Sequence, residues 1–326
     1  MIPGKTVSVG IHRTYSSRRH LSSSFGYGWD FNYNIWLQRM QDANEVHLFP
    51  GNGCSYKFTQ DPTDEDDYYC SSRPEDYLWY DSTSNEFTLY KTTDETYNFN
   101  SDDKIEKISY HDNTNNAISF DYNDVTGFLE TITDDLGREI SISYNNYDFI
   151  EAITDFNDRT WRYYYSSGDL TGVRTPTTTD HSTGLWTTYS YSSHNLTSIT
   201  DPNGDTIVSN SYDGSDRAWL QIVGNGYYEL DFDDANNTVT VTDRKGHDVD
   251  MLYNDAGQLT KRIVYTDDPN ADPNSFTTEY GYYAGNNRRA WVKYPEGNCT
   301  AFTYDTNGNL TGLYRKASLS DPNNRS

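Results

Sequence analysis

Two acidic stretches carry the residues best suited to bind a metal ion. The sequence DPTDEDD spans residues 61–67, and DDPNADPN spans residues 267–274. Carboxylate and amide oxygens are the ligands that Ca²⁺ prefers, so Asp267, Asp268 and Asp272 form a candidate calcium site. Neither stretch follows the EF-hand spacing, and a solvated acidic loop is the alternative that we favour for both.

Signatures of catalysis are missing from the sequence. It contains no H-E-x-x-H, no G-x-S-x-G and no phosphate-binding P-loop, and neither GYGWDF nor GNGYYE completes a dinucleotide-binding G-x-G-x-x-G. The seven histidines are scattered without the spacing of metal ligands. We therefore expect a protein that is not an enzyme and that needs no cofactor, apart from the calcium ion considered above.

The aromatic content suggests two uses. The chain holds 30 Tyr, 13 Phe and 7 Trp among 326 residues. Exposed rings would offer stacking platforms for sugars, which would make the protein a glycan-binding module. Because most of the aromatic residues that anchor the repeat described below sit at alternating positions, we favour packing into a core.

Charge and hydropathy exclude two classes of partner. The 49 acidic residues outnumber the 25 basic ones and give a formal net charge of -24. Such a chain repels phosphate backbones, so nucleic acid is not an expected partner. No apolar run approaches the roughly 18 to 20 residues that a membrane-spanning helix needs, so we expect no membrane span.

One phrase recurs along the chain. YNDAGQLTKRI at 253–263 is nearly repeated as YDTNGNLTGLY at 304–314. Aligning the aromatic residue that starts each phrase gives about ten copies with a period of roughly 22 residues. The aligned anchors are Phe99, Tyr122, Tyr144, Tyr165, Tyr191, Tyr212, Phe232, Tyr253, Tyr282 and Tyr304.

Each copy has the same internal pattern. Apolar residues alternate before the anchor, as in Ile140, Ile142 and Tyr144, which predicts a strand with one buried face. Turn residues follow, and then a second short segment whose apolar residues are three apart, as in Leu129 and Ile132. In a regular strand such positions face opposite sides, so either a bulge intervenes or both faces are partly covered.

These patterns predict an all-β protein in which helix is minor. Two strands and two turns fill each copy, and one hairpin cannot bury its apolar face alone, so its natural partner is the next copy. A strongly twisted sheet of so many strands cannot stay flat. We therefore expect repetitive antiparallel β-hairpins that form a coiled sheet, spiral or shell.

The repeated phrase resembles the Y-D…G-x-L repeat of the Rhs/YD-repeat family, which includes bacterial Rhs polymorphic toxins, Tc toxin C components, wall-associated proteins and teneurins. The stretch IHRTYSSRRHLSSSFGYGWDFNYN at 11–34 resembles the R-x-Y-x-S…G-x-G-W motif that precedes such repeats. We interpret the residues of this N-terminal motif as structural, because a glycine pair permits tight backbone beside a large indole. They are Arg13, Tyr15, Gly26, Gly28 and Trp29.

The resemblance implies an organisation and a role. Residues 1–60 would hold the N-terminal motif with short strands, residues 61–76 an acidic loop, and residues 77–326 the hairpin array. The family winds such repeats into a β-shell that encloses a C-terminal effector, or into a large extracellular scaffold. The closing segment, aspartate-based self-cleavage site and variable toxin domain of the family's cages have no counterpart in these 326 residues.

Three functions follow as hypotheses. The first is a non-catalytic structural segment of a secreted or cell-surface protein, with neighbouring repeats and an enclosed effector of a longer parent protein as its partners. The second is an adhesive or filament-forming extracellular module that associates with other copies of itself through open sheet ends. The third is a glycan-binding module.

Overall fold

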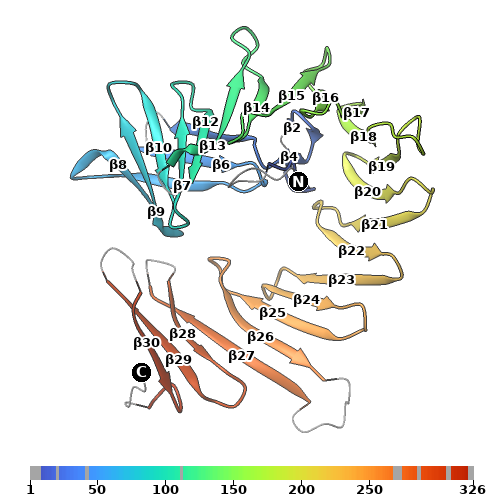
Figure 1. Cartoon of the computed structure of the whole chain (residues 1–326). Coiled ribbons are helices and arrows are strands. Elements are labelled where there is room, and N and C mark those ends of the chain that lie inside the picture. Colours follow the sequence, from blue (N-terminus) through green and yellow to red (C-terminus); the bar gives the residue numbers. More distant parts are fainter. Residues whose placement is uncertain are drawn as a thin grey trace. The chain divides into compact units, whose positions relative to one another are not determined.

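The computed structural model describes residues 9–19, 22–40, 44–110, 113–266, 274–284, 288–305 and 310–321. Within these ranges the chain forms 30 strands and no helix, which confirms the all-β prediction (Figure 1). The chain divides into two compact units, residues 1–205 and 206–326.

Unit 1 begins with four short strands. They are β1 (Arg13–Tyr15), β2 (Ser22–Ser23), β3 (Gly26–Tyr27) and β4 (Trp29–Phe31). We call the described residues 9–19 and 22–34, which contain these strands, the N-terminal segment. β1 pairs with β4, and β2 pairs with β3, both antiparallel.

A long sheet makes up the rest of unit 1. Its strands are β5 (Ile35–Met40), β6 (Glu45–Pro50), β7 (Tyr56–Asp61), β8 (Asp64–Cys70), β9 (Arg73–Asp81), β10 (Glu86–Tyr90), β11 (Glu95–Phe99), β12 (Ile105–Tyr110), β13 (Asn113–Tyr122), β14 (Leu129–Thr133), β15 (Glu139–Tyr144), β16 (Ile150–Thr154), β17 (Thr160–Ser166), β18 (Asp169–Arg174), β19 (Trp186–Ser192) and β20 (Asn195–Thr200). Each strand pairs antiparallel with the next one along the chain.

Unit 2 is a second run of hairpins. Its strands are β21 (Thr206–Tyr212), β22 (Ala218–Val223), β23 (Gly226–Asp233), β24 (Thr238–Thr242), β25 (Asp248–Tyr253), β26 (Leu259–Tyr265), β27 (Ser275–Tyr282), β28 (Arg289–Lys293), β29 (Cys299–Tyr304) and β30 (Leu310–Lys316). They too pair antiparallel in sequence order. The predicted hairpin repetition is therefore present in both units.

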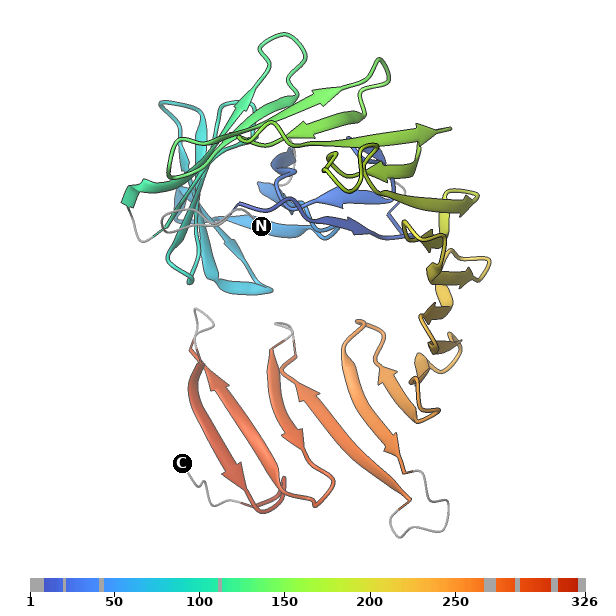
Figure 2. The same cartoon turned by 45° about the vertical axis from the view of Figure 1, so that its right-hand side comes forward.

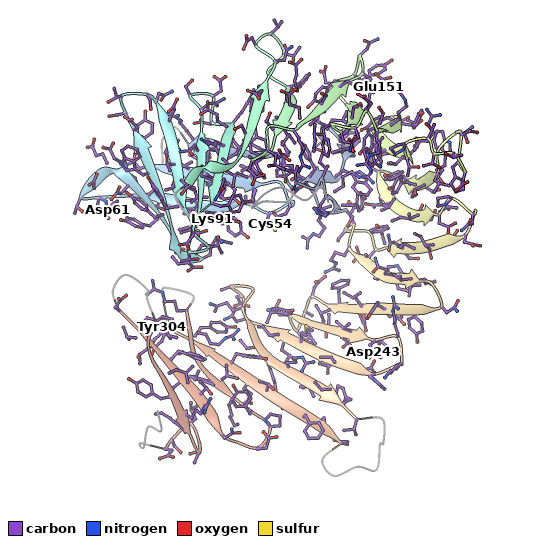
Figure 3. All side chains as sticks on the ribbon, viewed as in Figure 1. Cys54, Asp61, Lys91, Glu151, Asp243 and Tyr304 are labelled. Atoms are coloured by element: carbon purple, nitrogen blue, oxygen red, sulfur yellow. The ribbon has the colours of Figure 1, made fainter. Side chains whose placement is uncertain are left out.

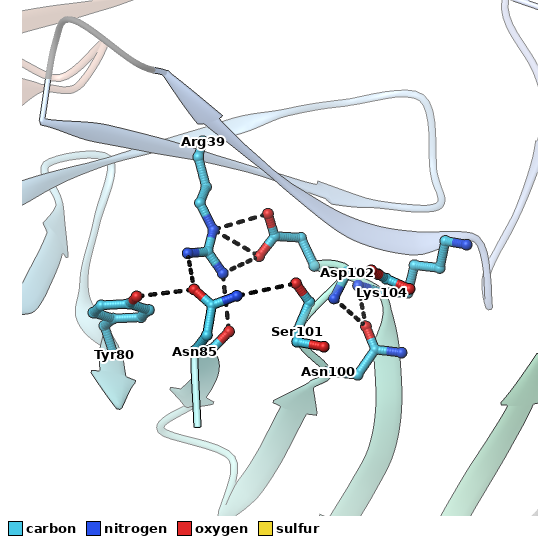
Figure 4. Close-up of polar contacts among 8 residues, drawn as sticks. Arg39, Tyr80, Asn85, Asn100, Ser101, Asp102 and Lys104 are labelled. Carbon is cyan, nitrogen blue, oxygen red and sulfur yellow. Dashed lines mark hydrogen bonds and ion pairs between the residues drawn. The ribbon is translucent and has the colours of Figure 1, made fainter. Parts of the chain in front are cut away.

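A polar network joins β5 to the turn between β11 and β12. The Leu37 backbone N–H donates to the Asp103 carbonyl at 2.8 Å. The Arg39 guanidinium donates to both carboxylate oxygens of Asp103 and to Asn85 Oδ1 at 2.7 Å (Figure 4). It also lies over the ring of Tyr80, 5.2 Å from the centroid. Because bidentate arginine–carboxylate pairs are strong and directional, Arg39 fastens the first strands of the sheet to one another.

The segment 61–76, predicted as an acidic loop, is mostly strand, so that part of the prediction was wrong. β8 occupies residues 64–70, and Tyr68 and Cys70 on it are buried. The acidic side chains of β8 are exposed or half-buried, and the alternation of strand side chains permits this while the other face packs inward. The predicted boundaries at residues 60 and 76 do not coincide with the division at residue 205 and remain predictions.

A β-bulge resolves the spacing of apolar residues in the second strand of each repeat. Asp121 pairs with Thr131, whereas the next residue, Tyr122, pairs with Leu129. The extra residue between the partners lets Leu129 and Ile132 both face the core, where they are 5% and 0% exposed. The same register shift precedes every anchor except Phe232.

The bulges position acceptors for the tyrosines of the following hairpins. Six anchor hydroxyls each donate to the carbonyl of the residue that is paired with the previous anchor across its bulge. These bonds, which we call the tyrosine ladder, are Tyr122 to Ile105 (2.9 Å), Tyr144 to Leu129 (2.9 Å), Tyr165 to Ile150 (2.8 Å), Tyr191 to Leu170 (2.7 Å), Tyr282 to Leu259 (2.8 Å) and Tyr304 to Arg289 (3.1 Å). Each bond therefore ties one hairpin to its predecessor.

The one anchor without a bulge, Phe232, shows that the ladder bond of the next anchor depends on the bulge. Phe232 pairs in regular register with Val239. The next anchor, Tyr253, contacts the sulfur of Met251 at 3.5 Å through its hydroxyl. In this hairpin a thioether sulfur, which is only a weak acceptor, takes the place of the backbone carbonyl that accepts from the other anchors of the ladder.

The anchors lie at the border of the core rather than at its centre. Phe99 is buried, and the other nine anchors are half-buried. Burial raises the pKa of Tyr122, Tyr144 and Tyr165 well above the usual value, so these phenols stay neutral and can donate. The centre of the core is filled by phenylalanine and aliphatic side chains such as Phe58, Ile132 and Ile150.

Three five-residue turns between strands are closed by the same aspartate–arginine contacts. Asp134 Oδ1 accepts from the backbone N–H groups of Leu136 and Arg138, and Arg138 Nε donates to Asp134 Oδ2 at 2.8 Å. Burial opposes ionisation of Asp134, but the bonds from Arg138 and the backbone hold its pKa below the usual value. The same arrangement recurs at 155–159 and 213–217.

The two units differ in burial. Nearly all of the buried side chains belong to unit 1, whereas the buried residues in the described part of unit 2 are Val292, Cys299 and Thr300. Figure 3 shows side chains packed densely around β14 to β18, while those on the strands of unit 2, Tyr304 among them, stand apart. The hairpin pattern alone therefore does not bury its apolar face.

The ladder predicts different costs for two equivalent substitutions in unit 2. Tyr282→Phe removes a bond to a backbone carbonyl and should lower the free energy of unfolding by about 1 kcal/mol. Tyr253→Phe removes only the weak contact with Met251, so its effect should stay within about 0.5 kcal/mol of zero. Denaturant unfolding of both variants beside the wild type measures the difference, and equal effects would contradict the ladder.

Candidate functional site

The N-terminal segment lies against the apolar face of the sheet in unit 1. In both views its blue strands lie beside the green strands that follow β15 (Figures 1 and 2). The Ile150 backbone N–H donates to the Ser24 carbonyl at 2.7 Å, and the Tyr27 N–H donates to the Gly168 carbonyl at 3.0 Å. Phe25 is fully buried between Phe31 and a ring of the sheet. The segment thus covers the apolar side chains that one layer of hairpins leaves open.

Arg13 is held in a cage of four aromatic rings. Its guanidinium carbon lies 5.3 Å from the ring centroid of Trp29, 5.4 Å from Tyr163 and 5.7 Å from both Phe25 and Tyr189. Arg13 Nη2 also donates to the Tyr189 hydroxyl at 3.1 Å. Two of the rings come from the N-terminal segment and two from the sheet. The cation therefore joins both layers through the negative faces of the rings.

Trp29 and Tyr15 connect the segment to the last strands of unit 1. Trp29 Nε1 donates to the Tyr191 hydroxyl at 2.8 Å, and that hydroxyl donates in turn to the ladder acceptor on β18. Burial raises the pKa of Tyr191 above its usual value, although the bond from Trp29 opposes the shift. The Tyr15 hydroxyl donates to the His194 carbonyl and accepts from the Leu196 N–H, both at 2.9 Å.

The two motif glycines stand where no side chain fits. Gly26 has φ +91°, and a Cβ there would lie 2.5 Å from the Gly168 carbonyl oxygen. Gly28 has φ +72°, and a Cβ there would lie 2.7 Å from the Tyr15 ring. Both the left-handed backbone and the close approach require glycine. The structure therefore brings Arg13, Tyr15 and Trp29 of the motif together with both glycines.

A buried aspartate that the sequence analysis did not single out holds the turn after the motif. Asp30 is 2% exposed and pairs with Arg19. Its carboxylate also accepts from Asn34 Nδ2 at 2.8 Å and from the backbone N–H of Gly53 at 3.2 Å. Such a saturated carboxylate is structural, because each of its oxygens is already bonded.

The candidate calcium site lies outside the described residues, since Asp267, Asp268 and Asp272 all fall in the gap 267–273. In the other acidic stretch, Asp61 Oδ1 accepts from the backbone and hydroxyl of Thr63 at 2.7 and 2.6 Å and so closes the β7–β8 turn. Within the ranges given above, no group of three or more His, Cys, Asp or Glu side chains is placed to hold a metal ion. The same ranges contain no helix long and apolar enough to cross a membrane.

Comparisons with known proteins found a family model that matches the N-terminal residues and solved structures that are similar in fold. A family model described as "Domain of unknown function (DUF6531)" matches residues 1–58, which include the motif and the first strands of the sheet. No curated protein matches the chain.

Several solved structures are similar in fold. The crystal structure of TcdB2-TccC3-TEV is 11% identical with a TM-score of 0.46, and the match covers 95% of this chain and 20% of that one. The structure of the Photorhabdus luminescens Tc holotoxin pore with the mutation TccC3-D651A is 11% identical with a TM-score of 0.40, over 89% of this chain and 20% of that one. The crystal structure of TcdB2-TccC3 is 12% identical with a TM-score of 0.35, over 83% and 19%. The chain thus spans about a fifth of the length of these structures.

The close approach at Gly26 can be separated from backbone strain with a matched glycine. Gly53 has φ +83°, but a Cβ there would meet nothing within 4 Å. Both alanine variants carry the cost of a left-handed residue, whereas only Gly26→Ala pushes the segment away from Gly168. We expect Gly26→Ala to lower the free energy of unfolding by at least about 2 kcal/mol more than Gly53→Ala, measured by denaturant unfolding. Equal losses would show that the contact with Gly168 does not matter.

Proposed function

We propose that the chain is a non-catalytic structural segment of a secreted or cell-surface protein, in which the hairpin array builds a β-shell or scaffold. The tyrosine ladder carries the proposal, because the same bond couples a hairpin to its predecessor at six places in the described residues. A sheet that is extended by identical hydrogen-bonded repeats is typical of a structural layer rather than of an active site. The Rhs/YD-like repeat and N-terminal motif support the same role.

An enclosed effector of a longer parent protein is the partner that we propose for the array. Unit 2 leaves large apolar side chains exposed, and Ile222 and Tyr227, which are paired across β22 and β23, are both 40% exposed. In unit 1 the N-terminal segment covers apolar side chains of the sheet. A polypeptide held beside unit 2 would bury such residues in the same way.

Self-association is the second candidate, and the same exposed residues favour it. Apolar pairs on an extended sheet can bind another copy, although the net charge of -24 opposes this until salt screens it. An adhesive or filament-forming module would then result.

Light scattering of the purified chain separates the two candidates. A structural segment should keep the mass of one chain at low and high salt and across concentrations. Growth of the mass with concentration would overturn the first candidate, provided that Ile222→Ser with Tyr227→Ser suppresses it. Val125→Ser is the control, because Val125 is 92% exposed in a turn of unit 1.

A further inference from the structure

A polar cavity lies among the first strands of unit 1, and Asn32 near the end of the N-terminal segment is part of its lining. Its volume is about 220 Å³, and Tyr56, Arg73, Asp76, Lys91 and Tyr97 contribute to its lining. Asn52, which is exposed, also lines the cavity, so the cavity meets the surface at the loop between β6 and β7.

The carboxylate of Asp76 is incompletely bonded in this cavity. The Asp76 side chain is 1% exposed, and its Oδ2 accepts from Arg73 Nε at 2.5 Å. Its Oδ1 is buried and accepts no hydrogen bond from the described residues. Leaving a buried charged acceptor unbonded is costly, so the site calls for a donor from a bound group. The contrast with Asp30, whose two oxygens are both bonded, shows that this chain does satisfy buried carboxylates elsewhere.

The charges around the cavity cancel in pairs. Arg73 balances Asp76, and Lys91 Nζ donates to Glu95 at 2.8 Å and to the Tyr97 hydroxyl at 3.2 Å. A cationic ligand would meet Arg73 and Lys91, and an anionic one would meet Asp76. The pattern therefore selects a neutral ligand.

The walls add apolar surface to these polar groups. Leu48 and Leu89 line the cavity and are 4% and 1% exposed, and the rings of Tyr56 and Tyr97 also line it. Aromatic and aliphatic walls suit the C–H faces of a ring or short chain, while its hydroxyls donate to the carboxylate and accept from the ammonium. We propose that this cavity binds a neutral polyhydroxylated molecule, a polyol or a single sugar ring, with a ligand hydroxyl donating to Asp76 Oδ1. The proposal is independent of the structural role of the array.

The test titrates the whole chain with glycerol, myo-inositol, D-glucose and D-galactose as neutral probes, and with D-glucosamine and D-glucuronate as charged ones. Saturation-transfer NMR detects binding, and calorimetry measures affinity. We expect at least one neutral probe to bind with a Kd of about 1 mM or tighter. Failure of every neutral probe at about 50 mM, or tighter binding of a charged probe, would overturn the proposal.

Variants place the binding in the cavity. In Asp76→Asn the amide oxygen would turn to Arg73, so a donor would replace the free acceptor, and affinity should fall at least about tenfold. A second variant, Asn52→Trp, covers the case in which Asp76→Asn does not fold. Asn52 is exposed at the mouth of the cavity, so a tryptophan there should block entry and reduce the affinity to the same extent. Asp155→Asn is the control, because Asp155 is a buried, arginine-paired aspartate in a hairpin turn and does not line the cavity. Unchanged affinity in both cavity variants would show that the probe binds elsewhere.

Discussion

The fold of unit 1 depends on one constraint: a single layer of hairpins has an apolar face that something must cover. The N-terminal segment covers it, and Arg13 joins the two layers, with rings from both around its guanidinium. The residues of the motif each serve this contact, because the glycines allow the close approach and Trp29 bonds to a ladder tyrosine. In the described part of unit 2, most apolar side chains of equivalent strands are half-buried or exposed.

The tyrosine ladder supplies the second requirement, which is coupling along the sheet. A bulge turns the residue after each turn so that its carbonyl can accept from the next anchor, and the bulge also brings apolar residues three apart onto one face. One local irregularity thus serves both packing and hydrogen bonding. The regular register at Phe232 and the weak contact of Tyr253 show what is lost without it.

Much of this could be predicted from the sequence, because period and turn chemistry are local. The alternation before Tyr144 and the spacing of Leu129 and Ile132 specified hairpins and left a bulge as one of two explanations, and the structure selects the bulge. The strand β8 was missed because its acidic residues obscured the buried Tyr68 and Cys70. Contacts such as Arg39 with Asp103 and Arg13 with Tyr189 join residues 64 and 176 positions apart, and no local pattern encodes them.

Hydrogen exchange of the backbone amides tests most directly whether the N-terminal segment holds the sheet. Phe25→Ala removes a fully buried ring from the contact, whereas Phe87→Ala removes an equally buried ring that packs between Tyr68 and Tyr80. Each substitution should cost about 3 kcal/mol or more where it acts. The account predicts that Phe25→Ala speeds exchange in β16 to β20 by on the order of 100-fold and that Phe87→Ala acts mainly on β8 to β11. Exchange in β16 to β20 that rises no more with Phe25→Ala than with Phe87→Ala would contradict it.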